Sequence, residues 1–231
     1  MSKYVPARSA VWEKGYISYR RLWLDSCLEA SSDEMRGIVI DLGGKREKKQ
    51  KRGTFKPPEE KARAWWYINL DRNTSPNIFA DVNQAPLGGQ SVDCVICTEV
   101  LEHIPDPKAC VHEMYRLLQK GGMAFVSAPF MYPVHADPFD FQRFTDEGLR
   151  NLFKDFASVE IIQMGSYAGT LGMLIEIGIE GVQGKSFLQR IMRWSMRRIA
   201  RGLCWFDLSH YDLENVVWNK FTTGYFVKAV R

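Results

Sequence analysis

Short apolar runs alternate with polar turns and helical patterns through the middle of the chain. Five of these runs have the composition of buried strands. They cover residues 37–44, 65–71, 78–81, 92–98 and 123–128. A helical pattern over 107–118 precedes the fifth run, with Gly121 and Gly122 as its expected stop. Strands and helices that alternate at this spacing predict βαβ units in a mostly parallel sheet with helices on both faces.

The segments on either side extend this pattern. Residues 11–30 carry large apolar side chains at alternating spacings of four and three, which predicts an amphipathic helix before the sheet. After the fifth strand, the chain is loop-like over 130–140 and helical over 146–154. Further strands are expected over 159–164 and 222–230.

Residues 185–205 form a distinct basic helical segment before the last strand. On a helical wheel, an apolar face lies opposite a row of arginines, and aromatic residues flank both. The apolar face is Leu188, Ile191, Met192, Ser195, Ile199 and Leu203, the arginines are Arg190, Arg193, Arg197 and Arg201, and the aromatics are Phe187, Trp194 and Trp205. Two interpretations stay open: an interfacial helix on a membrane surface, or a helix that packs its apolar face on the core while its arginines face water.

The composition is that of a globular protein with unevenly placed charge. Of 231 residues, 45% are hydrophobic and 25% are charged, which excludes a disordered or fibrous chain. The net charge of +4 is too small for a general nucleic-acid footprint. Residues 45–63 hold nine basic and three acidic side chains, and residues 185–201 hold six basic and no acidic ones. Two local basic patches therefore stand out.

The cysteines indicate whether the chain works in a reducing or an oxidising compartment. The five cysteines are scattered, which argues against a disulfide framework and predicts a reducing environment. Cys94 and Cys97 lie inside an apolar run without a second pair, which favours buried thiols over a zinc site. The N-terminus lacks a secretory pattern, and residues 161–179 fall short of a membrane span because Glu176 and several glycines interrupt them. We expect a cytoplasmic chain, at most peripheral at the inner face of the membrane.

The carboxyl ends of the expected strands carry glycines and polar side chains, where ligands bind in an open parallel sheet. These residues are Gly43, Gly44, Asp71, Asp81, Thr98 and Glu99. Asp71 closes the second strand, where a carboxylate can accept hydrogen bonds from both hydroxyls of a ribose. Alternatively, Asp71 caps the N-terminus of the next helix.

Two motifs carry a resemblance to a known family. The run DCVICTEVLEHIPDPK at 93–108, followed by EMYRLLQKGG at 113–122, resembles the class I S-adenosylmethionine-dependent methyltransferases of type 11. The likeness covers about residues 37–155. The run PFMYPVHADPFDFQRFT at 129–145 resembles a subgroup with the pattern H-x-x-P-x-D-x-x-R-[FY]-T, whose members accompany polysaccharide and lipopolysaccharide biosynthesis.

The resemblance implies a fold and a division of the chain. The fold is a Rossmann-like, doubly wound α/β sheet of seven mostly parallel strands, with the last strand antiparallel. The expected parts are an N-terminal helical segment over 1–36, a methyltransferase core over 37–184, a basic helical insertion over 185–215 and the final core strand over 216–231.

The resemblance also implies how the first strand binds S-adenosyl-L-methionine. Asp41 and Gly43 match the acid and first glycine of the turn that holds the methionyl part of the cofactor. The usual pattern places glycines where this chain has Lys45 and Glu47. A side chain at position 45 can crowd the turn, and Gly44 is the residue able to supply the missing freedom.

Further cofactor roles follow from the same resemblance. Asp71 matches the ribose-binding acid. Asp81 and Val82 match the pair that contacts adenine. Thr98 and Glu99 match residues that lie beside the cofactor after the fourth strand.

The loop after the fifth strand holds the candidate catalytic residues. The sugar hydroxyl that the second motif suggests has a high pKa, so its methylation benefits from a general base. His135 is the candidate for this base, and Asp137 or Asp140 is expected to orient its ring. Tyr132 either stacks on a sugar ring or packs as an ordinary aromatic. Arg143 either pairs with Asp140 or clamps an acidic sugar or phosphate. The alternative is that His135, Asp140 and Arg143 only brace the loop.

One histidine and one pair of acids are expected to have structural roles. His103 follows the fourth strand at a helix start and is expected to be a structural or cofactor-side residue rather than the base. No metal site is expected, because turn chemistry explains the pair Asp137 and Asp140.

These expectations converge on methylation of a sugar hydroxyl in a cell-surface glycan or its precursor. One alternative is a small-molecule methyltransferase that acts on a quinone or a secondary metabolite. Another is a non-catalytic cofactor-binding module that regulates a glycan-synthesis partner, which gains if Lys45 blocks the turn. A nucleic-acid partner is disfavoured because neither basic patch contains a base-flipping aromatic motif.

Overall fold

The computed structural model describes residues 3–14, 16–46, 53–135, 138–182, 184, 186–212, 214–215 and 217–231. Its centre is one seven-stranded sheet with the order β3-β2-β1-β4-β5-β7-β6. The strands are β1 Gly37–Leu42, β2 Ala62–Asn69, β3 Ile78–Phe79, β4 Val92–Thr98, β5 Leu118–Pro129, β6 Ser158–Gln163 and β7 Gly224–Val230. The longer helices are α1 Tyr19–Ser31, α2 Pro107–Leu117, α3 Asp146–Leu152, α4 Tyr167–Glu180 and α5 Phe187–Ser209.

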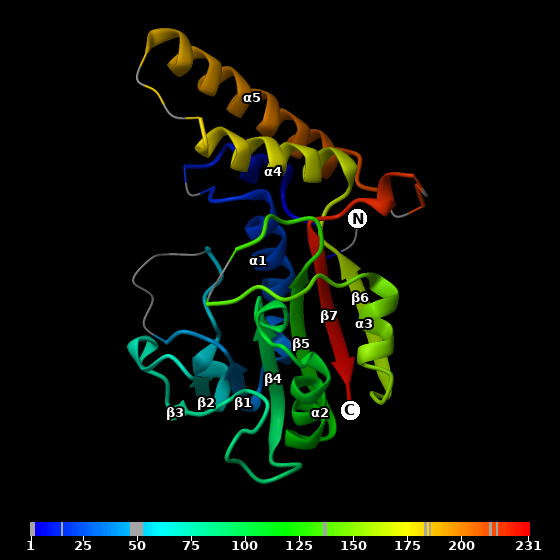
Figure 1. Ribbon diagram of the computed structural model, residues 1–231. Helices are drawn as coiled ribbons and strands as arrows, with labels where there is room; N and C mark the ends of the chain where they lie inside the picture. The colour runs from blue at the N-terminus through cyan, green and yellow to red at the C-terminus, as the bar shows by residue number, and fades with distance from the viewer. Residues whose placement is uncertain are drawn as a thin grey trace.

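The strand directions confirm the predicted fold class. The neighbours from β3 to β5 all pair in parallel, whereas β7 runs antiparallel to both β5 and β6. Helices cover both faces of the sheet (Figure 1). The carboxyl ends of β1, β2, β4 and β5 therefore meet at one edge, where ligands bind in such sheets.

Two apolar cores lie on opposite faces of the sheet. One includes residues of α2 and α3, and the other includes residues of α1, α4 and α5. Strand β4 contributes to both, with Cys97 in the first core and Cys94 in the second. This explains the unbroken apolar run in the sequence. It also confirms that the C-x2-C is a pair of buried thiols, because its two side chains belong to different cores.

Two helix boundaries differ from the sequence prediction. Helix α2 ends at Leu117, and the chain enters β5 at once, so Gly121 and Gly122 lie inside a strand instead of ending the helix. Gly122 is needed there because a Cβ would stand 3.0 Å from the carbonyl oxygen of Asp93 on the neighbouring strand. Helix α1 begins only at Tyr19, where the Ser18 hydroxyl accepts a hydrogen bond from a first-turn amide.

The chain between β6 and β7 forms a helical hairpin, of which the sequence predicted only α5. Helix α4 is glycine-rich, which hid its period, and one of these glycines makes the packing possible: a Cβ on Gly172 would stand 2.5 Å from the carbonyl oxygen of Ala200. Within the described residues, no helix has the length and apolar content that crossing a bilayer needs. Of the two interpretations left open for residues 185–205, packing of the apolar face on the core does not hold for Leu188 and Ile199, which are exposed.

Candidate functional site

The turn after β1 is a glycine turn held by the neighbouring strand. Gly43 has a φ of +77°, and a Cβ there would stand 2.5 Å from the Val100 side chain. Its amide donates to the Ile68 carbonyl oxygen at 2.8 Å. The Asn69 side-chain amide donates to the carbonyl oxygens of Gly43 and Gly44 at 2.9 and 3.1 Å. Asn69 therefore fixes the turn, a role that the sequence analysis missed.

Gly44 leaves space in the turn, although Lys45 and Glu47 stand where the family usually has glycines. A Cβ on Gly44 would overlap the carboxylate of Asp41, so the acid of β1 packs directly against the backbone of the turn. Lys45 is half-buried just beyond it, and Glu47 lies outside the described residues. Backbone open to close approach beside a carboxylate fits the methionyl part of the expected cofactor.

The acids after β2 and β3 have local hydrogen bonds. One carboxylate oxygen of Asp71 accepts from the backbone amide and the side chain of Asn73, both at 2.9 Å. Asp81 accepts from the amide of Asn83 at 2.9 Å. Both acids are exposed, and Val82 beside Asp81 is buried. Asp71 thus caps a short turn as one interpretation held, and a ribose role for its other oxygen stays a prediction.

Glu99 follows Thr98, the last residue of β4, and forms a bidentate ion pair with Arg20 of α1. The two nitrogen–oxygen distances are 2.5 and 2.9 Å, and the Ser127 hydroxyl donates to the same carboxylate at 2.6 Å. Burial alone would raise the pKa of Glu99, but Arg20 outweighs it, so the pKa lies below its usual value. Both carboxylate oxygens are bound within the protein and shape the end of β4. The expected place of Thr98 and Glu99 beside the cofactor stays a prediction.

Arg20 also connects α1 to the last strand and to the catalytic loop. It donates to the Thr223 carbonyl oxygen at 2.7 Å, and its guanidinium lies 5.8 Å from the centre of the Tyr132 ring. The sequence analysis did not single out Arg20. A signal was present, since Arg20 has the helical phase of Tyr16 and Trp23, an unusual place for an arginine on an apolar face.

The loop over 130–145 docks on the short helix Leu101–His103, which joins the two sequence motifs. The Phe141 amide donates to the Glu102 carbonyl oxygen at 2.8 Å, and the Gln142 side chain donates to the Ile104 carbonyl oxygen at 2.7 Å. His103 Nδ1 lies 2.5 Å from the Phe139 carbonyl oxygen. Because a carbonyl only accepts, this ring nitrogen carries a proton, so in the neutral ring the lone pair is on Nε2 of His103.

His135, Asp140 and Arg143 form one network in this loop. The His135 amide donates to Asp140 at 2.8 Å, and His135 Nδ1 lies 3.4 Å from the same carboxylate oxygen. Arg143 makes a bidentate pair with Asp140 and holds the pKa of that acid well below its usual range. Asp137, the other expected orienting acid, lies outside the described residues.

Arg143 is a loop brace. Beyond its pair with Asp140, its guanidinium donates to the carbonyl oxygens of Pro133 and Gln142 at 3.0 and 2.9 Å. These bonds leave it turned toward the protein. The substrate-clamp interpretation of Arg143 is therefore not supported, whereas the expected pairing with Asp140 is present.

Glu102 lies at the centre of the site and is fully buried. Neither of its carboxylate oxygens has a hydrogen-bond partner among the described residues. Nε2 of His103 and Nε2 of His135 lie 3.7 and 4.0 Å from one of them. Burial, reinforced by Glu99, raises the pKa of Glu102 to about 8. The sequence analysis quoted Glu102 inside its motif but gave it no role.

This cluster can hold a proton or a divalent cation. One donor atom from each of Glu102, His103 and His135 lies within 4.8 Å of the others. Two imidazoles and a carboxylate form a common donor set for transition metals, and the Nδ1 contacts of both rings orient Nε2 inward. Spacing along the sequence does not show this cluster, because His135 reaches it from a separate loop. The expectation of no metal site stays a prediction. Tyr132 lies beside it, with its ring centre 5.1 Å from that of His135.

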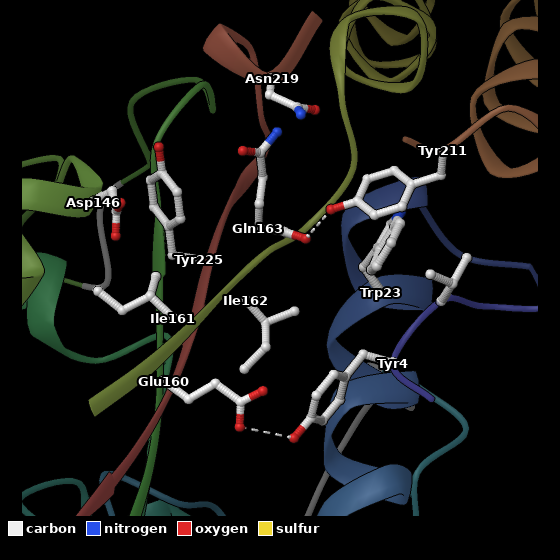
Figure 2. A pocket seen from close by; sticks show the side chains of 11 residues that line it. Tyr4, Trp23, Asp146, Glu160, Ile161, Ile162, Gln163, Tyr211, Asn219 and Tyr225 are labelled. Carbon is white, nitrogen blue, oxygen red and sulfur yellow. Dashed lines mark hydrogen bonds between the residues drawn. The ribbon is translucent and has the colours of Figure 1, made fainter. Parts of the chain in front are cut away.

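A separate cavity of about 290 Å³ lies along the sheet edge at β6. Figure 2 shows Glu160, Ile161, Ile162 and Gln163 of this strand in its wall. The Tyr211 hydroxyl donates to the Gln163 carbonyl oxygen at 2.9 Å across one end. The histidines and Glu102 do not line this cavity, so it is distinct from the site described above.

Known proteins share both a segment of the sequence and the fold. Residues 60–126 match a family model described as a methyltransferase domain. The ubiquinone biosynthesis O-methyltransferase of Klebsiella pneumoniae is 50% identical over 38 residues, and that of Xanthomonas oryzae is 51% identical over 37 residues. The chain spans only 16% of the length of these curated relatives.

Solved structures extend the likeness to most of the chain. A SAM-dependent methyltransferase from Archaeoglobus fulgidus has a TM-score of 0.55 at 12% identity, covering 91% of this chain and 94% of that one. Phosphoethanolamine N-methyltransferase 2 of Haemonchus contortus, in complex with S-adenosyl-L-methionine, has a TM-score of 0.54 at 14% identity, covering 97% of this chain and 56% of that one. The chain therefore has the fold of the S-adenosylmethionine-dependent methyltransferases and carries a segment of methyltransferase-domain type.

Proposed function

We propose that the chain is an S-adenosylmethionine-dependent O-methyltransferase that acts on a sugar hydroxyl of a cell-surface glycan or its precursor. The observation that carries this proposal is the pairing of His135 with the buried Glu102 beside the carboxyl end of β4. The glycine turn after β1 ends at the same edge of the sheet. A proton acceptor beside a cofactor turn is the equipment that methylation of a hydroxyl requires.

The cofactor would be held by the turn and the strand ends. Asp41, Gly43 and Gly44 would hold its methionyl part, with Asp71 at the ribose and Asp81 near the adenine. When bound, the cofactor supplies a methyl group on a sulfonium, which is reactive without activation by the protein. The tasks left to this chain are therefore to align the acceptor and to remove its proton.

His135 would act as the general base. Its Nδ1 lies 3.3 Å from the Pro133 carbonyl oxygen and 3.4 Å from Asp140, so the ring keeps one orientation and presents Nε2 as the acceptor of the hydroxyl proton. Removal of this proton would leave the hydroxyl oxygen able to take the methyl group that the bound cofactor would supply, with S-adenosylhomocysteine as the leaving group. The positive imidazolium then lies next to the ionised Asp140, which stabilises the charge.

The choice of a sugar hydroxyl rests on the motif over 129–145. The five cysteines are free and buried, which suits a cytoplasmic enzyme that works on a precursor before export. The second candidate is a phenolic hydroxyl of a quinone precursor, favoured by the short likeness to ubiquinone biosynthesis O-methyltransferases. The non-catalytic candidate is weakened, because Gly43 and Gly44 keep the turn open despite Lys45.

Calorimetric titration with S-adenosylhomocysteine tests the cofactor assignment. Wild-type protein should bind in the micromolar range, and Asp71→Ala and Gly44→Ala should each weaken binding by on the order of tenfold or more. Gly88→Ala is the matched control, since a Cβ there meets no atom within 4 Å. No binding at millimolar ligand would refute the proposal.

A panel of acceptors tests the substrate class. Nucleotide-linked and lipid-linked sugars should become heavier by one methyl group in mass spectrometry, and catechol-type quinone precursors should not. Transfer to the phenols alone would move the assignment to the second candidate.

A further inference from the structure

Helix α5 presents its apolar face to solvent. Leu188, Trp194 and Ile199 are 76%, 64% and 58% exposed, and Phe187 and Ile191 beside them are also exposed. An amphipathic helix on a globular protein ordinarily buries this face against the core. Figure 1 shows α5 as the outermost element of the hairpin, lying on α4 at the top of the molecule. The apolar face is therefore available to a surface outside the chain.

The opposite face of α5 is firmly attached, which fixes this orientation. Asp207 is fully buried and accepts hydrogen bonds from the Tyr19 hydroxyl and from the amide of Ser166, the latter at 2.9 Å. Arg201 lies 3.5 Å from Glu176 of α4. Polar contacts of this kind depend on direction, so the helix cannot turn its apolar face inward without breaking them.

Positive charge borders the apolar face. Residues 187–206 include five arginines and no acid. Together with Trp12, four residues of α5 line a groove of about 460 Å³, and they are Trp194, Arg197, Arg198 and Arg201. The Arg198 guanidinium lies 5.1 Å from the centre of the Trp12 ring and 5.8 Å from that of Trp194. Cationic groups beside indole rings suit phosphate headgroups at a lipid–water boundary.

We propose that the outer face of α5 binds the surface of an anionic phospholipid bilayer, with the helix lying in the plane of the interface. The 23-residue helix is roughly 35 Å long, carries too much charge to cross the membrane and combines an apolar face with a cationic flank. Its exposed aromatic and aliphatic side chains enter the boundary of the acyl chains, while the groove meets lipid phosphates.

The charge pattern favours a bilayer over a second copy of the chain. A twofold contact across α5 would bring the same arginine-rich patch of two molecules together. Residues 187–206 contain no acid, and Asp207 of α5 is fully buried, so the helix offers no exposed acid to pair with those charges. The hairpin also lies beyond the end of the sheet where β4 and β5 terminate (Figure 1), so a bound membrane would face the catalytic edge. The inference itself does not depend on methyl transfer.

Co-sedimentation of the full chain with vesicles tests this inference. The bound fraction should be on the order of tenfold higher with phosphatidylcholine vesicles that contain one-third phosphatidylglycerol than with phosphatidylcholine alone, and it should fall as salt rises. Phospholipids brominated on their acyl chains should quench the fluorescence of the wild type more than that of Trp194→Phe. The quenching separates insertion from simple charge attraction.

Two pairs of variants separate the apolar and cationic contributions. Leu188→Ser with Ile199→Ser should abolish quenching, and Arg190→Gln with Arg197→Gln should remove the preference for anionic lipid. The matched charge control is Arg36→Gln with Arg63→Gln, two exposed residues at the opposite end of the sheet. The apolar control is Phe79→Ser on the edge strand β3. Unchanged circular dichroism and S-adenosylhomocysteine binding would show that the α5 variants remain folded.

Three results would overturn the inference. One is equal binding to neutral and anionic vesicles, and another is equal loss of binding in the control variants. The third is a dimer in analytical ultracentrifugation that Leu188→Ser with Ile199→Ser dissociates, since a second copy would then cover this face. Loss of cofactor binding in wild-type protein would count against the proposed function and leave this inference intact.

Discussion

The Nε2 atom of His135 lies 4.0 Å from a carboxylate oxygen of Glu102, and neither oxygen of that carboxylate has a hydrogen-bond partner among the described residues. A buried carboxylate in this position costs free energy unless a proton or a cation neutralises it. A native fold keeps such a group where function requires it. The relationship therefore makes the stability of the protein sensitive to the ionisation of Glu102.

Glu102→Gln should stabilise the protein in a pH-dependent way. The pKa of Glu102 is about 8 in the folded chain and roughly 4.3 when unfolded. Between these values the folded state holds the proton and the unfolded state releases it, so the free energy of unfolding falls as pH rises. The Tm of Glu102→Gln should therefore exceed that of the wild type by a margin that grows from pH 5 to pH 8. The corresponding difference in the free energy of unfolding should grow by up to about 1.4 kcal/mol per pH unit.

Thermal melts in EDTA measure this difference without interference from metals. Glu147→Gln, at an exposed position of α3, is the control and should give the same small offset at every pH. A constant difference between wild type and Glu102→Gln across this range would show that Glu102 ionises normally.

His135→Ala should lower kcat by about 10²–10⁴ and leave S-adenosylhomocysteine binding within about twofold, because the base acts only on the acceptor proton. Asp140→Asn should cause a smaller loss, since it keeps the base and weakens only the contacts of Asp140 with His135 and Arg143. Added imidazole should restore part of the activity of His135→Ala, which a purely structural histidine would not allow. His112→Ala, on an exposed face of α2, is the control.

The Arg20–Glu99 pair should be worth several times more than a surface pair. Arg20 is buried, so Arg20→Met leaves the charge of Glu99 without its partner and should cost about 3 kcal/mol in urea unfolding. Adding Glu99→Gln should recover part of this loss. The control is Arg150→Met in the exposed Arg150–Asp146 pair, which should cost under about 1 kcal/mol. Equal costs at the two sites would contradict this assignment.

Local pattern in the sequence was enough for most of the sheet but not for the helical hairpin. Strand β4 was predicted because burial on both faces leaves an unbroken apolar run. Helix α4 was missed because glycines interrupt its period, among them Gly172, which packs against α5, and Gly169, which packs against Tyr19 of α1. The helical wheel of α5 gave its two faces correctly. It could not say which face points outward, because buried contacts such as that of Asp207 decide the orientation.

The candidate site shows the same division. Asp140 beside His135 was predicted because four residues in one loop separate them. Glu102 belongs to the short helix Leu101–His103 and His135 to a separate loop, and their approach depends on docking of that loop onto the helix. Arg20 reaches Glu99 from another helix. Such contacts depend on tertiary packing, which spacing along a single sequence does not encode.

Removal and return of a divalent cation should change the stability of the protein through this cluster. An ion that binds the folded chain and not the unfolded chain raises Tm with its concentration. Mn²⁺ added to chelator-treated protein should therefore raise Tm, because Glu102, His103 and His135 offer one carboxylate and two imidazole nitrogens within 4.8 Å. Glu102→Gln and His135→Ala should each remove this increase, whereas Glu147→Gln should keep it. An increase that survives in Glu102→Gln would place the ion elsewhere and leave the cluster as a proton-holding site.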